Sequence, residues 1–352
     1  MSISRRQLLV SGAGLAVSGA LGSVGSANVW GQPAASRVGL ALTIGLDKLS
    51  RNHYSPLPVA LASCVNDAKA MERIAKNAGF TKVIPLHNEN ATRFEVCRHI
   101  YHASQRLKAG DLFLVTISSH GFTGAVGETA DQEEDGKDEG WCLYDWMMVD
   151  DEAYSLWQLF QPGVRILAIA DTCHAGTSAK LMNYAKSLGM NPNQPPVLDA
   201  EPKGPPLNPK SLPPGLAKNL GSVLGLPEDS PAVTDVFYPA KSLTDEEIEG
   251  TYQKGKADYD AVLGSVLSHL KSDAAMTASG LLIASSQDHQ SSFAGNPYSA
   301  FTRELVEVWK NPPGSYRDLF TAILGRLRWQ TPNWYPFGVL DPQFHSQRPF
   351  TV

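Results

Sequence analysis

The chain has 352 residues, of which 43 % are hydrophobic and 18 % are charged. This composition is typical of a globular protein with one large domain or two smaller ones, and it argues against a disordered chain. The net charge is −5 at pH 7, which excludes the broad basic surface that nucleic-acid binding requires. We therefore expect no nucleic-acid partner.

The first residues carry the pattern of an export signal. Arg5 and Arg6 precede a Gly- and Ala-rich apolar stretch over residues 8–24, as in twin-arginine signal peptides. A disordered basic tail is the less favoured alternative. We expect cleavage after Ala27, or near Ala34, and export of the folded protein to a periplasm or the cell exterior. The stretch is weakly apolar and rich in glycine, so we expect no membrane span after signal removal.

Short apolar runs alternate with helical patterns over the next part of the chain. The runs are β-branched and bounded by Gly or polar residues, which indicates buried strands. A capping box at Thr92 and Glu95 predicts the start of one helix. The predicted strands cover residues 38–45, 82–86, 111–118 and 164–170, and the predicted helices cover 64–78, 92–107 and 152–160. This order predicts a doubly wound, parallel α/β sheet.

An acidic segment separates the third of these strands from the fourth. Residues 128–152 contain eleven Asp or Glu residues and one Lys. Such a run is usually a solvated loop. Clustered carboxylates beside the turn Asp135-Gly136 would also suit a hard cation such as calcium, although the spacing is not that of an EF-hand. Both interpretations remain open at this stage.

The second half of the chain begins with a proline-rich stretch. Residues 190–239 show no periodicity, so we predict an exposed loop or linker there, and also one further helix after Cys173. Thr244 and Glu247 predict the start of a helix that ends near Leu270. Beyond it we predict a strand at 280–286, helices at 299–309 and 315–330, and a final strand in the tail at 344–352. The corresponding divisions of the chain are 1–35, 36–189, 190–275 and 276–352.

A histidine and a cysteine follow two of the predicted strands. His120 comes after the strand at 111–118, and Cys173 comes after the strand at 164–170. Sites in parallel α/β sheets form beyond the carboxyl ends of the strands, so a base and a thiol would project into one crevice. Each residue alone is more often structural, but together they indicate a nucleophilic cysteine. We prefer His120 to His174 as the base, because residues adjacent in a strand face opposite ways.

Backbone amides and carboxylates complete this candidate site. The N–H groups of Gly121 and Cys173 are placed to face a developing oxyanion. Asp171 lies two residues before Cys173, on the same side of the strand, and Asp67 begins a helix near the end of the first strand. Two carboxylates in one pocket would attract a cationic side chain. For Asp67 taken alone, a favourable charge at a helix N-terminus is the preferred explanation.

Three segments resemble the metacaspases, of a bacterial, type I-like kind. The segment 171–176, Asp-Thr-Cys-His-Ala-Gly, resembles the signature of that family around its cysteine. Residues 118–121, Ser-Ser-His-Gly, resemble its Ser-Gly-His-Gly motif, and residues 64–68, Cys-Val-Asn-Asp-Ala, resemble its motif near the amino end. The segment 285–291 is similar to the part that precedes the helices of the small subunit. Ser119 departs from the pattern, because it replaces a glycine.

The resemblance implies a caspase-like fold, with a mostly parallel six-stranded sheet flanked by helices on both faces. On this resemblance, 36–189 corresponds to the large subunit and 276–352 to the small one. The implied activity is cysteine endopeptidase cleavage after Arg or Lys. The resemblance assigns catalysis to His120 and Cys173, and the specificity pocket to Asp67, Ser118 and Asp171.

The resemblance also implies calcium activation and self-processing. Asp138, Asp150 and Asp151 match the calcium-binding carboxylates of the family, although the stretch between the first two is short. Several lysines after the catalytic cysteine are candidate points of self-cleavage; they are Lys180, Lys186, Lys203, Lys210 and Lys218. The partners would be peptides or proteins with a basic residue before the cleaved bond, and we expect a monomer.

Two other functions remain open. The chain could be a non-catalytic caspase-like binding or scaffold module, against which the presence of both His120 and Cys173 argues. A different hydrolase with the same pair, such as an amidase, is the other alternative. Cys64, Cys97 and Cys142 are the remaining cysteines, and an exported protein is permitted a disulfide among them.

Overall fold

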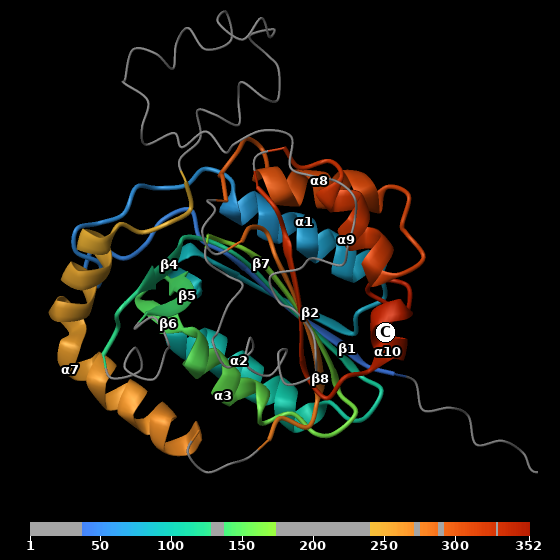
Figure 1. Ribbon diagram of the computed structural model, residues 1–352, viewed down its shortest axis with the longest axis horizontal. Coiled ribbons are helices and arrows are strands. Elements are labelled where there is room, and N and C mark those ends of the chain that lie inside the picture. The colour runs from blue at the N-terminus through green and yellow to red at the C-terminus, as the bar shows by residue number, and fades with distance from the viewer. Residues whose placement is uncertain (1–36, 128–136, 174–239, 271–274, 288–291, 329) are drawn as a thin grey trace, which may run out of the picture. The chain divides into compact units, whose positions relative to one another are not determined.

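A six-stranded sheet forms the centre of the structure, which is a computed structural model (Figure 1). The structure describes residues 37–127, 137–173, 240–270, 275–287, 292–328 and 330–352, all within the unit Arg37–Val352. The strand order is β2-β1-β3-β7-β8-β9. The bounds are β1 Gly39–Gly45, β2 Lys82–His87, β3 Leu112–Ser118, β7 Arg165–Asp171, β8 Ser279–Ala284 and β9 Asn333–Gly338. The first five are parallel, and β9 pairs antiparallel with β8.

Alternate residues of the central strands face two separate cores. In β3, Phe113 and Val115 belong to one core, and Leu112 and Leu114 belong to the other. This alternation follows from the period of two in a strand, and apolar residues on both faces suit a sheet covered on both sides. The first core packs against α2 (Arg93–Arg106) and α3 (Asp150–Trp157), and the second against α1 (Cys64–Asn77), α8 (Ala300–Trp309) and α9 (Tyr316–Leu324).

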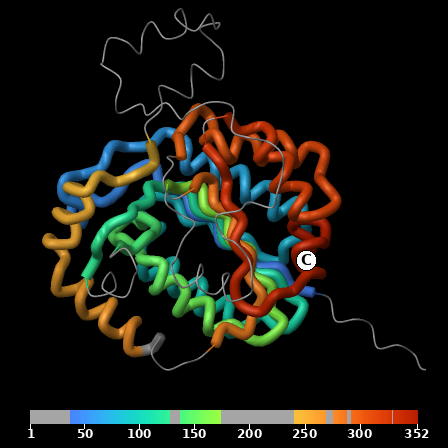
Figure 2. Tube along the Cα trace, in the orientation of Figure 1, coloured from blue at the N-terminus to red at the C-terminus, as the bar shows by residue number. Residues whose placement is uncertain are grey.

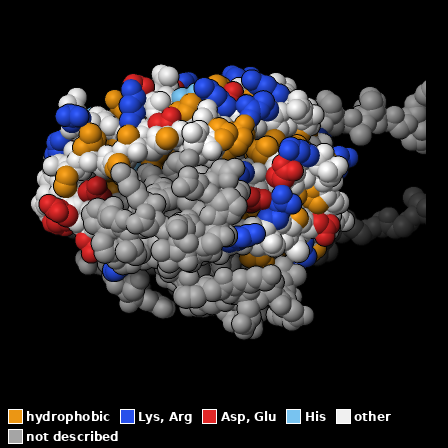
Figure 3. Space-filling model, turned by 90° about the horizontal axis from the view of Figure 1, so that it is seen from above, with side chains coloured by type: hydrophobic (Ala, Val, Ile, Leu, Met, Phe, Trp, Pro, Cys, Tyr) orange, Lys and Arg blue, Asp and Glu red, His pale blue; other side chains and the backbone are white. Residues whose placement is uncertain are grey.

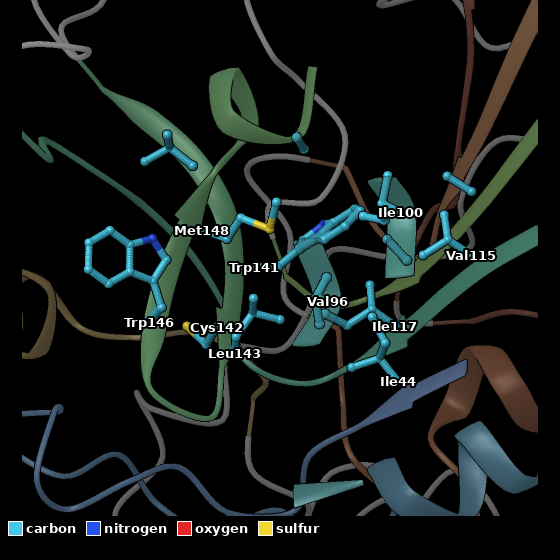
Figure 4. Close-up of a cluster of buried hydrophobic side chains, with 14 of the residues drawn as sticks. Ile44, Val96, Ile100, Val115, Ile117, Trp141, Cys142, Leu143, Trp146 and Met148 are labelled. Atoms are coloured by element: carbon cyan, nitrogen blue, oxygen red, sulfur yellow. The ribbon is translucent and has the colours of Figure 1, made fainter. Parts of the chain in front are cut away.

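A smaller antiparallel sheet lies beside α2 and α3, where we expected a solvated acidic loop. Its strands are β4 (Gly121–Gly124), β5 (Asp138–Leu143) and β6 (Trp146–Val149). That expectation was wrong for Asp138–Val149, because apolar side chains from this hairpin are buried against the sheet and α2. Figure 4 shows Trp141 and Met148 on the side of the hairpin toward Val96 and Ile100.

A long helix, α7 (Asp245–Leu270), packs on the outside of this small sheet. Its Tyr259 ring stacks on Trp146 of β6 with ring centroids 3.8 Å apart, and the Tyr259 hydroxyl accepts a hydrogen bond from the backbone N–H of Met147. The helix begins as the sequence predicts, because Thr244 and Glu247 bond to each other in a capping box. The small sheet therefore has α7 on its outer side, and α7 also contacts α3 and the loop between β1 and α1.

Most of the predicted elements are confirmed, but the last two, at 315–330 and 344–352, differ from the prediction. The helix predicted at 315–330 ends at Leu324, and the predicted tail strand at 344–352 was wrong. The tail instead contains α10 (Pro342–Ser346), because the Asp341 side chain accepts hydrogen bonds from the backbone N–H groups of Gln343 and Phe344. The final strand is β9, which our prediction omitted. In Figure 2 the last residues of the chain (red) lie beside the beginning of β1, where Val352 approaches Gly39.

Several expectations concern residues outside the described ranges. The export signal, the proline-rich stretch and the helix after Cys173 all belong to this group. Among the described helices, none has the length and apolar character that crossing a membrane demands. Seen from above, the described surface carries Lys and Arg side chains interspersed with acidic and hydrophobic ones (Figure 3).

Candidate active site

The two candidate catalytic residues follow strands that are neighbours in the sheet. Ser118 of β3 and Asp171 of β7 are register partners, and His120 and Cys173 each lie two residues farther along. A Cβ atom on Gly121 would overlap the carbonyl oxygen of Cys173, so the two backbones touch just beyond the sheet. The chain segments that carry the imidazole and the thiol thus leave the same edge of the sheet, as the sequence predicts.

The Cys173 thiol is fully buried and bonded to one residue of the loop after β8. The backbone N–H of Ser292 donates to Sγ at 2.9 Å, and the thiol donates to the Ser292 carbonyl oxygen at 3.4 Å. Burial raises the pKa of Cys173 to about 12, although the hydrogen bond from Ser292 opposes this shift. The thiol is therefore protonated at neutral pH and needs a base before it can attack a carbonyl carbon.

The His120 ring is held by a backbone carbonyl. Its Nε2 lies 2.7 Å from the carbonyl oxygen of Val59, in the loop between β1 and α1. A carbonyl oxygen only accepts hydrogen bonds, so Nε2 carries the proton in the neutral ring and Nδ1 is the basic nitrogen. This geometry leaves the ring able to take up a proton at Nδ1.

Two buried carboxylates lie at the same edge of the sheet, on α1 and β7. Asp67 accepts hydrogen bonds from the Ser118 hydroxyl at 2.7 Å, from the backbone N–H of Ser299 at 2.9 Å and from the Ser299 hydroxyl. Asp171 accepts from the hydroxyls of Ser292 at 2.9 Å and Thr302 at 2.7 Å. Asp67, Ser118 and Asp171, the predicted pocket residues, are therefore brought together.

The structure adds a residue that the sequence analysis did not select, Lys241. Its side chain is fully buried between the two carboxylates. The ammonium Nζ lies 2.9 Å from Oδ1 of Asp171, 2.8 Å from the Asp171 carbonyl oxygen, 2.9 Å from the Ser118 hydroxyl and 3.6 Å from Oδ2 of Asp67. A buried ammonium needs compensating charges and acceptors, and this pocket supplies both.

Burial and charge act in opposite directions on the groups of this pocket. Burial would lower the pKa of Lys241, but the nearby carboxylate charges, that of Asp171 above all, raise it overall. Burial raises the pKa of Asp67 to about 6, although the charge of Lys241 opposes this shift. At neutral pH the pocket is thus an acidic one that holds a protonated amine.

The backbone of Lys241 also contacts the candidate oxyanion donors. Its carbonyl oxygen accepts hydrogen bonds from the N–H of Gly121 at 2.8 Å and from the N–H of Cys173 at 3.4 Å. Its own N–H donates to the carbonyl oxygen of Ser292 at 2.9 Å. The two amides that the sequence analysis selected thus converge on one carbonyl oxygen, as an oxyanion site requires.

The candidate metal ligands are described, but the acidic residues 128–136 that precede them are not. Asp138 accepts a hydrogen bond from the backbone N–H of Val126, and Asp150 and Asp151 lie in the first turn of α3. Within the described ranges, no three His, Cys, Asp or Glu side chains come together as a metal site.

The other cysteines are free in the structure. Cys64 and Cys142 are buried and Cys97 is half-buried. Burial raises the pKa of Cys64 and of Cys97 to about 12, and that of Cys142 well above its usual value. These thiols are protonated at neutral pH.

Known proteins resemble this chain in sequence and in fold. A model of the caspase domain family matches residues 38–346. The solved structure of protein GSU0716 from Geobacter sulfurreducens is similar, with a TM-score of 0.65 and 32 % identity, over 90 % of this chain and 99 % of that one.

Curated metacaspases are also similar to the chain. Metacaspase-1B of Aspergillus oryzae is 30 % identical over 164 residues, which are 43 % of this chain and 37 % of that protein. Metacaspase-1A of Aspergillus niger is 26 % identical over 314 residues, 82 % of this chain and 66 % of that protein. The chain spans about a third of the length of the first of these relatives. The match of the family model over most of the sequence shows that the chain belongs to the caspase-domain family of cysteine peptidases.

Proposed function

We propose that the protein is an endopeptidase that cleaves peptide bonds after Lys or Arg, with Cys173 as the nucleophile and His120 as the acid–base residue. The observation that carries the proposal is the position of Lys241. Its ammonium lies between Asp67 and Asp171, while its carbonyl oxygen accepts hydrogen bonds from Gly121 and Cys173. A basic side chain and the carbonyl that follows it are thus bound together.

The proposed reaction uses these groups in turn. Nδ1 of His120 takes the thiol proton, and Sγ of Cys173 attacks the carbonyl carbon that follows the basic residue. The N–H groups of Gly121 and Cys173 stabilise the oxyanion. His120 then protonates the leaving amine, and water hydrolyses the resulting thioester. The hydrogen bond from Nε2 to Val59 keeps the ring in the tautomer that this sequence of steps needs.

Peptide cleavage by the full chain tests the proposal. Matched fluorogenic peptides ending in Arg, Lys or Asp should be cleaved at different rates. We expect the Arg and Lys peptides to be cleaved roughly 10²-fold faster than the Asp peptide, because a like charge in the acidic pocket costs several kcal/mol. The Cys173→Ala variant is the control. A preference for Asp would contradict the acidic pocket. Cleavage of small amides without peptides would favour an amidase, and no cleavage at all would favour a scaffold module.

Calcium activation is part of the proposal, and its support is the resemblance alone. The assay is therefore run with calcium and with a chelator. A rate that depends on calcium, and that falls in an Asp138→Asn variant, would support binding at the acidic segment. An equal rate under both conditions would remove calcium from the proposal.

Export by the twin-arginine route and a monomeric state are also proposals, supported by the sequence. Replacement of Arg5 and Arg6 by Lys should retain the protein in the cytoplasm of a bacterial host, which fractionation would detect. Size-exclusion chromatography with light scattering tests the monomer.

A further inference from the structure

We propose that Thr251 of α7 is a positioning residue for His120, and that it acts through the loop between β1 and α1. The inference rests on the proposed function, because it takes His120 as the acid–base residue. It goes beyond that function by naming a residue on a helix outside the small sheet that the reaction needs.

The carbonyl group that holds the imidazole lies in a stretch that side-chain packing fixes poorly. Nε2 of His120 is 2.7 Å from the carbonyl oxygen of Val59. The Val59 side chain is 59 % exposed and that of Leu57 is 39 % exposed, and within residues 56–60 only Pro58 is buried. Side chains with so much exposed surface have few neighbours that could fix the backbone. The position of the Val59 carbonyl therefore depends on backbone anchors before and after it.

Two hydrogen bonds of the backbone enclose this stretch. After Val59, the N–H of Leu61 donates to the carbonyl oxygen of Asp47 at 2.7 Å. Before Val59, the N–H of Ser55 donates to the hydroxyl oxygen of Thr251 at 3.1 Å. The first anchor belongs to the loop itself, whereas the second comes from α7. The helix thus fixes one end of the segment that carries the Val59 carbonyl.

The segment between Ser55 and Val59 is stiff. It contains Pro56 and Pro58, and the ring of each proline fixes the φ torsion of its residue. Few backbone torsions remain that could absorb a movement of Ser55. A displacement at the contact with α7 is therefore passed on to the carbonyl group that holds the imidazole.

One face of α7 forms this contact. Gly250, Thr251 and Lys254 lie on the same side of the helix, because residues three and four apart are neighbours on its surface. The Thr251 side chain is buried, and a Cβ atom on Gly250 would overlap the carbonyl oxygen of Ser55. The Lys254 ammonium donates to two carbonyl oxygens within residues 51–54. All of these contacts reach the backbone of the loop, so α7 sets its path.

The hairpin of β5 and β6 holds the same loop by a different contact. The Tyr54 hydroxyl lies 2.7 Å from the carbonyl oxygen of Leu143 and 2.8 Å from that of Trp146. This anchor acts at the far end of a long side chain, whereas Thr251 bonds to the backbone itself. Loss of the Thr251 hydroxyl would therefore leave the loop folded and loosen the backbone that leads to Val59.

The reaction step that depends on this anchor is proton transfer. With the Val59 carbonyl in place, Nε2 of His120 carries the proton and Nδ1 is the nitrogen that takes one from Cys173. A misplacement of about 1 Å can lower a rate about 10²-fold. The carboxylates of the acidic pocket lie on α1 and β7, outside this loop. We therefore expect a displaced loop to lower kcat and to leave KM almost unchanged.

Steady-state cleavage of an Arg peptide by full-length variants tests the inference. Thr251→Val removes the acceptor without a change of volume, and we expect kcat to fall roughly tenfold with KM within about twofold of wild type. Thr251→Ser keeps the hydroxyl and should keep the wild-type kcat. Thr277→Val is the matched control, because its hydroxyl bonds to the carbonyl oxygen of Phe160 at 3.1 Å, at the opposite edge of the sheet.

A second pair of variants tests the same contact without changing the hydroxyl. Gly250→Ala should lower kcat as well, because its Cβ would push on the carbonyl oxygen of Ser55. Gly264→Ala lies on the same helix and meets no atom within 4 Å, so its kcat should equal that of wild type. Circular dichroism verifies that each variant folds. If Thr251→Val does not fold, Gly250→Ala and Gly264→Ala decide the question.

Nuclear magnetic resonance of protein with ¹⁵N-labelled histidine measures the hold on the imidazole directly. The Nε2 proton of His120 should exchange slowly with water in wild type, and its resonance is assigned by its absence in His120→Gln. Exchange should be faster in Thr251→Val and unchanged in Thr277→Val, because only the first loosens the bond to Val59.

The outcomes separate this inference from the proposed function. An active protein in which Thr251→Val and Gly250→Ala keep the wild-type kcat would overturn the inference alone. A lower kcat with unchanged exchange of the His120 proton, or an equal loss in Thr277→Val, would also overturn it. A wild-type protein that cleaves no peptide would overturn the proposed function, and the exchange rates would still show whether Thr251 holds the imidazole.

Discussion

The backbone N–H of Ser292 and the sulfur of Cys173 are 2.9 Å apart, and the thiol donates back to the carbonyl oxygen of the same residue. Ser292 also accepts the N–H of Lys241. One residue of the loop after β8 therefore contacts both the thiol and the segment in the pocket, and release of that segment alters the surroundings of the thiol.

We expect alkylation of Cys173 by iodoacetamide to be slow in the wild-type protein. The pKa of this thiol is raised to about 12 by burial, so the reactive thiolate is scarce at neutral pH and grows about tenfold per pH unit below that value. Lys241→Gln should label faster at pH 7.5, as mass spectrometry of the Cys173 peptide will measure. The half-buried Cys97 provides an internal control. A labelling rate that levels off near pH 7 would contradict this prediction.

Protonation of Asp67 should weaken the binding of basic peptides in acid. Its pKa is raised to about 6 by burial, so the carboxylate is charged above that pH and neutral below it. The KM for an Arg peptide should therefore rise as the pH falls. Measurements use the Lys241→Gln background, where loss of the Lys241 charge raises the pKa of Asp67 further, so the rise in KM should begin above pH 6. In Asp67→Asn this dependence should disappear, and a dependence that persists there would assign it to another group.

Asp171 should contribute more to specificity than Asp67, because its carboxylate lies closer to the bound ammonium. We expect Asp171→Asn to lower kcat/KM for Lys and Arg peptides by roughly 10²-fold, since removal of one partner of a buried charge pair costs several kcal/mol. Asp318→Asn, an exposed carboxylate at the start of α9, is the control. Equal losses in both variants would show that the effect is not local.

Gly121→Ala should abolish activity, because its Cβ would overlap the backbone carbonyl of Cys173. A backbone atom cannot rotate out of the way as a side-chain atom can, so the segments that follow β3 and β7 must shift apart. We expect a loss of more than about 10²-fold in kcat. Gly264→Ala in α7 is the control, because no atom lies within 4 Å of its added Cβ. That change should raise the free energy of unfolding by about 0.5–1 kcal/mol.

Arg165 should stabilise the end of the sheet far from the site. Its buried guanidinium donates to the carbonyl oxygens of Gly110 at 2.6 Å and Thr351 at 3.1 Å, and to the Gln347 side chain at 2.7 Å. Arg165→Met should lower the free energy of unfolding by roughly 2–4 kcal/mol, because these buried acceptors lose a charged donor. Denaturant unfolding measures this. Arg326→Met, which removes an exposed pair with Glu304, should cost less than about 1 kcal/mol.

Most of the fold could be predicted from the sequence because most of its strands and helices follow from patterns within a few consecutive residues. Short apolar runs and capping boxes such as Thr92–Glu95 extend over a few residues, and they predicted the central strands and α2. The hairpin of β5 and β6 was missed because the acidic residues of 128–152 outweighed two short apolar runs, at 141–143 and 146–149. In β9, Pro336 concealed a strand, although an edge strand tolerates proline.

The pocket was predicted in part. The residues that were missed, Lys241, Ser299 and Thr302, lie far along the chain from the aspartates that they contact. Asp67, Ser118 and Asp171 lie within recognisable motifs. Lys241 lies 70 residues from Asp171 and 123 from Ser118, across residues that show no periodicity. Ser299 and Thr302 reach the carboxylates only when α8 packs on the sheet edge. The sole local signal for Lys241 is its place just before the capped start of α7, which suggests a constrained segment.

The loop that orients His120 is fastened by α7 as well. The N–H of Ser55 donates to the Thr251 hydroxyl, and the Lys254 ammonium donates to the carbonyl oxygens of Arg51 and Tyr54. The same helix follows the Lys241–Ser242 bond. A molecule that bound the outer surface of α7 would thus displace both the His120 imidazole and Leu243. An inhibitor directed there need not resemble a peptide or compete with one.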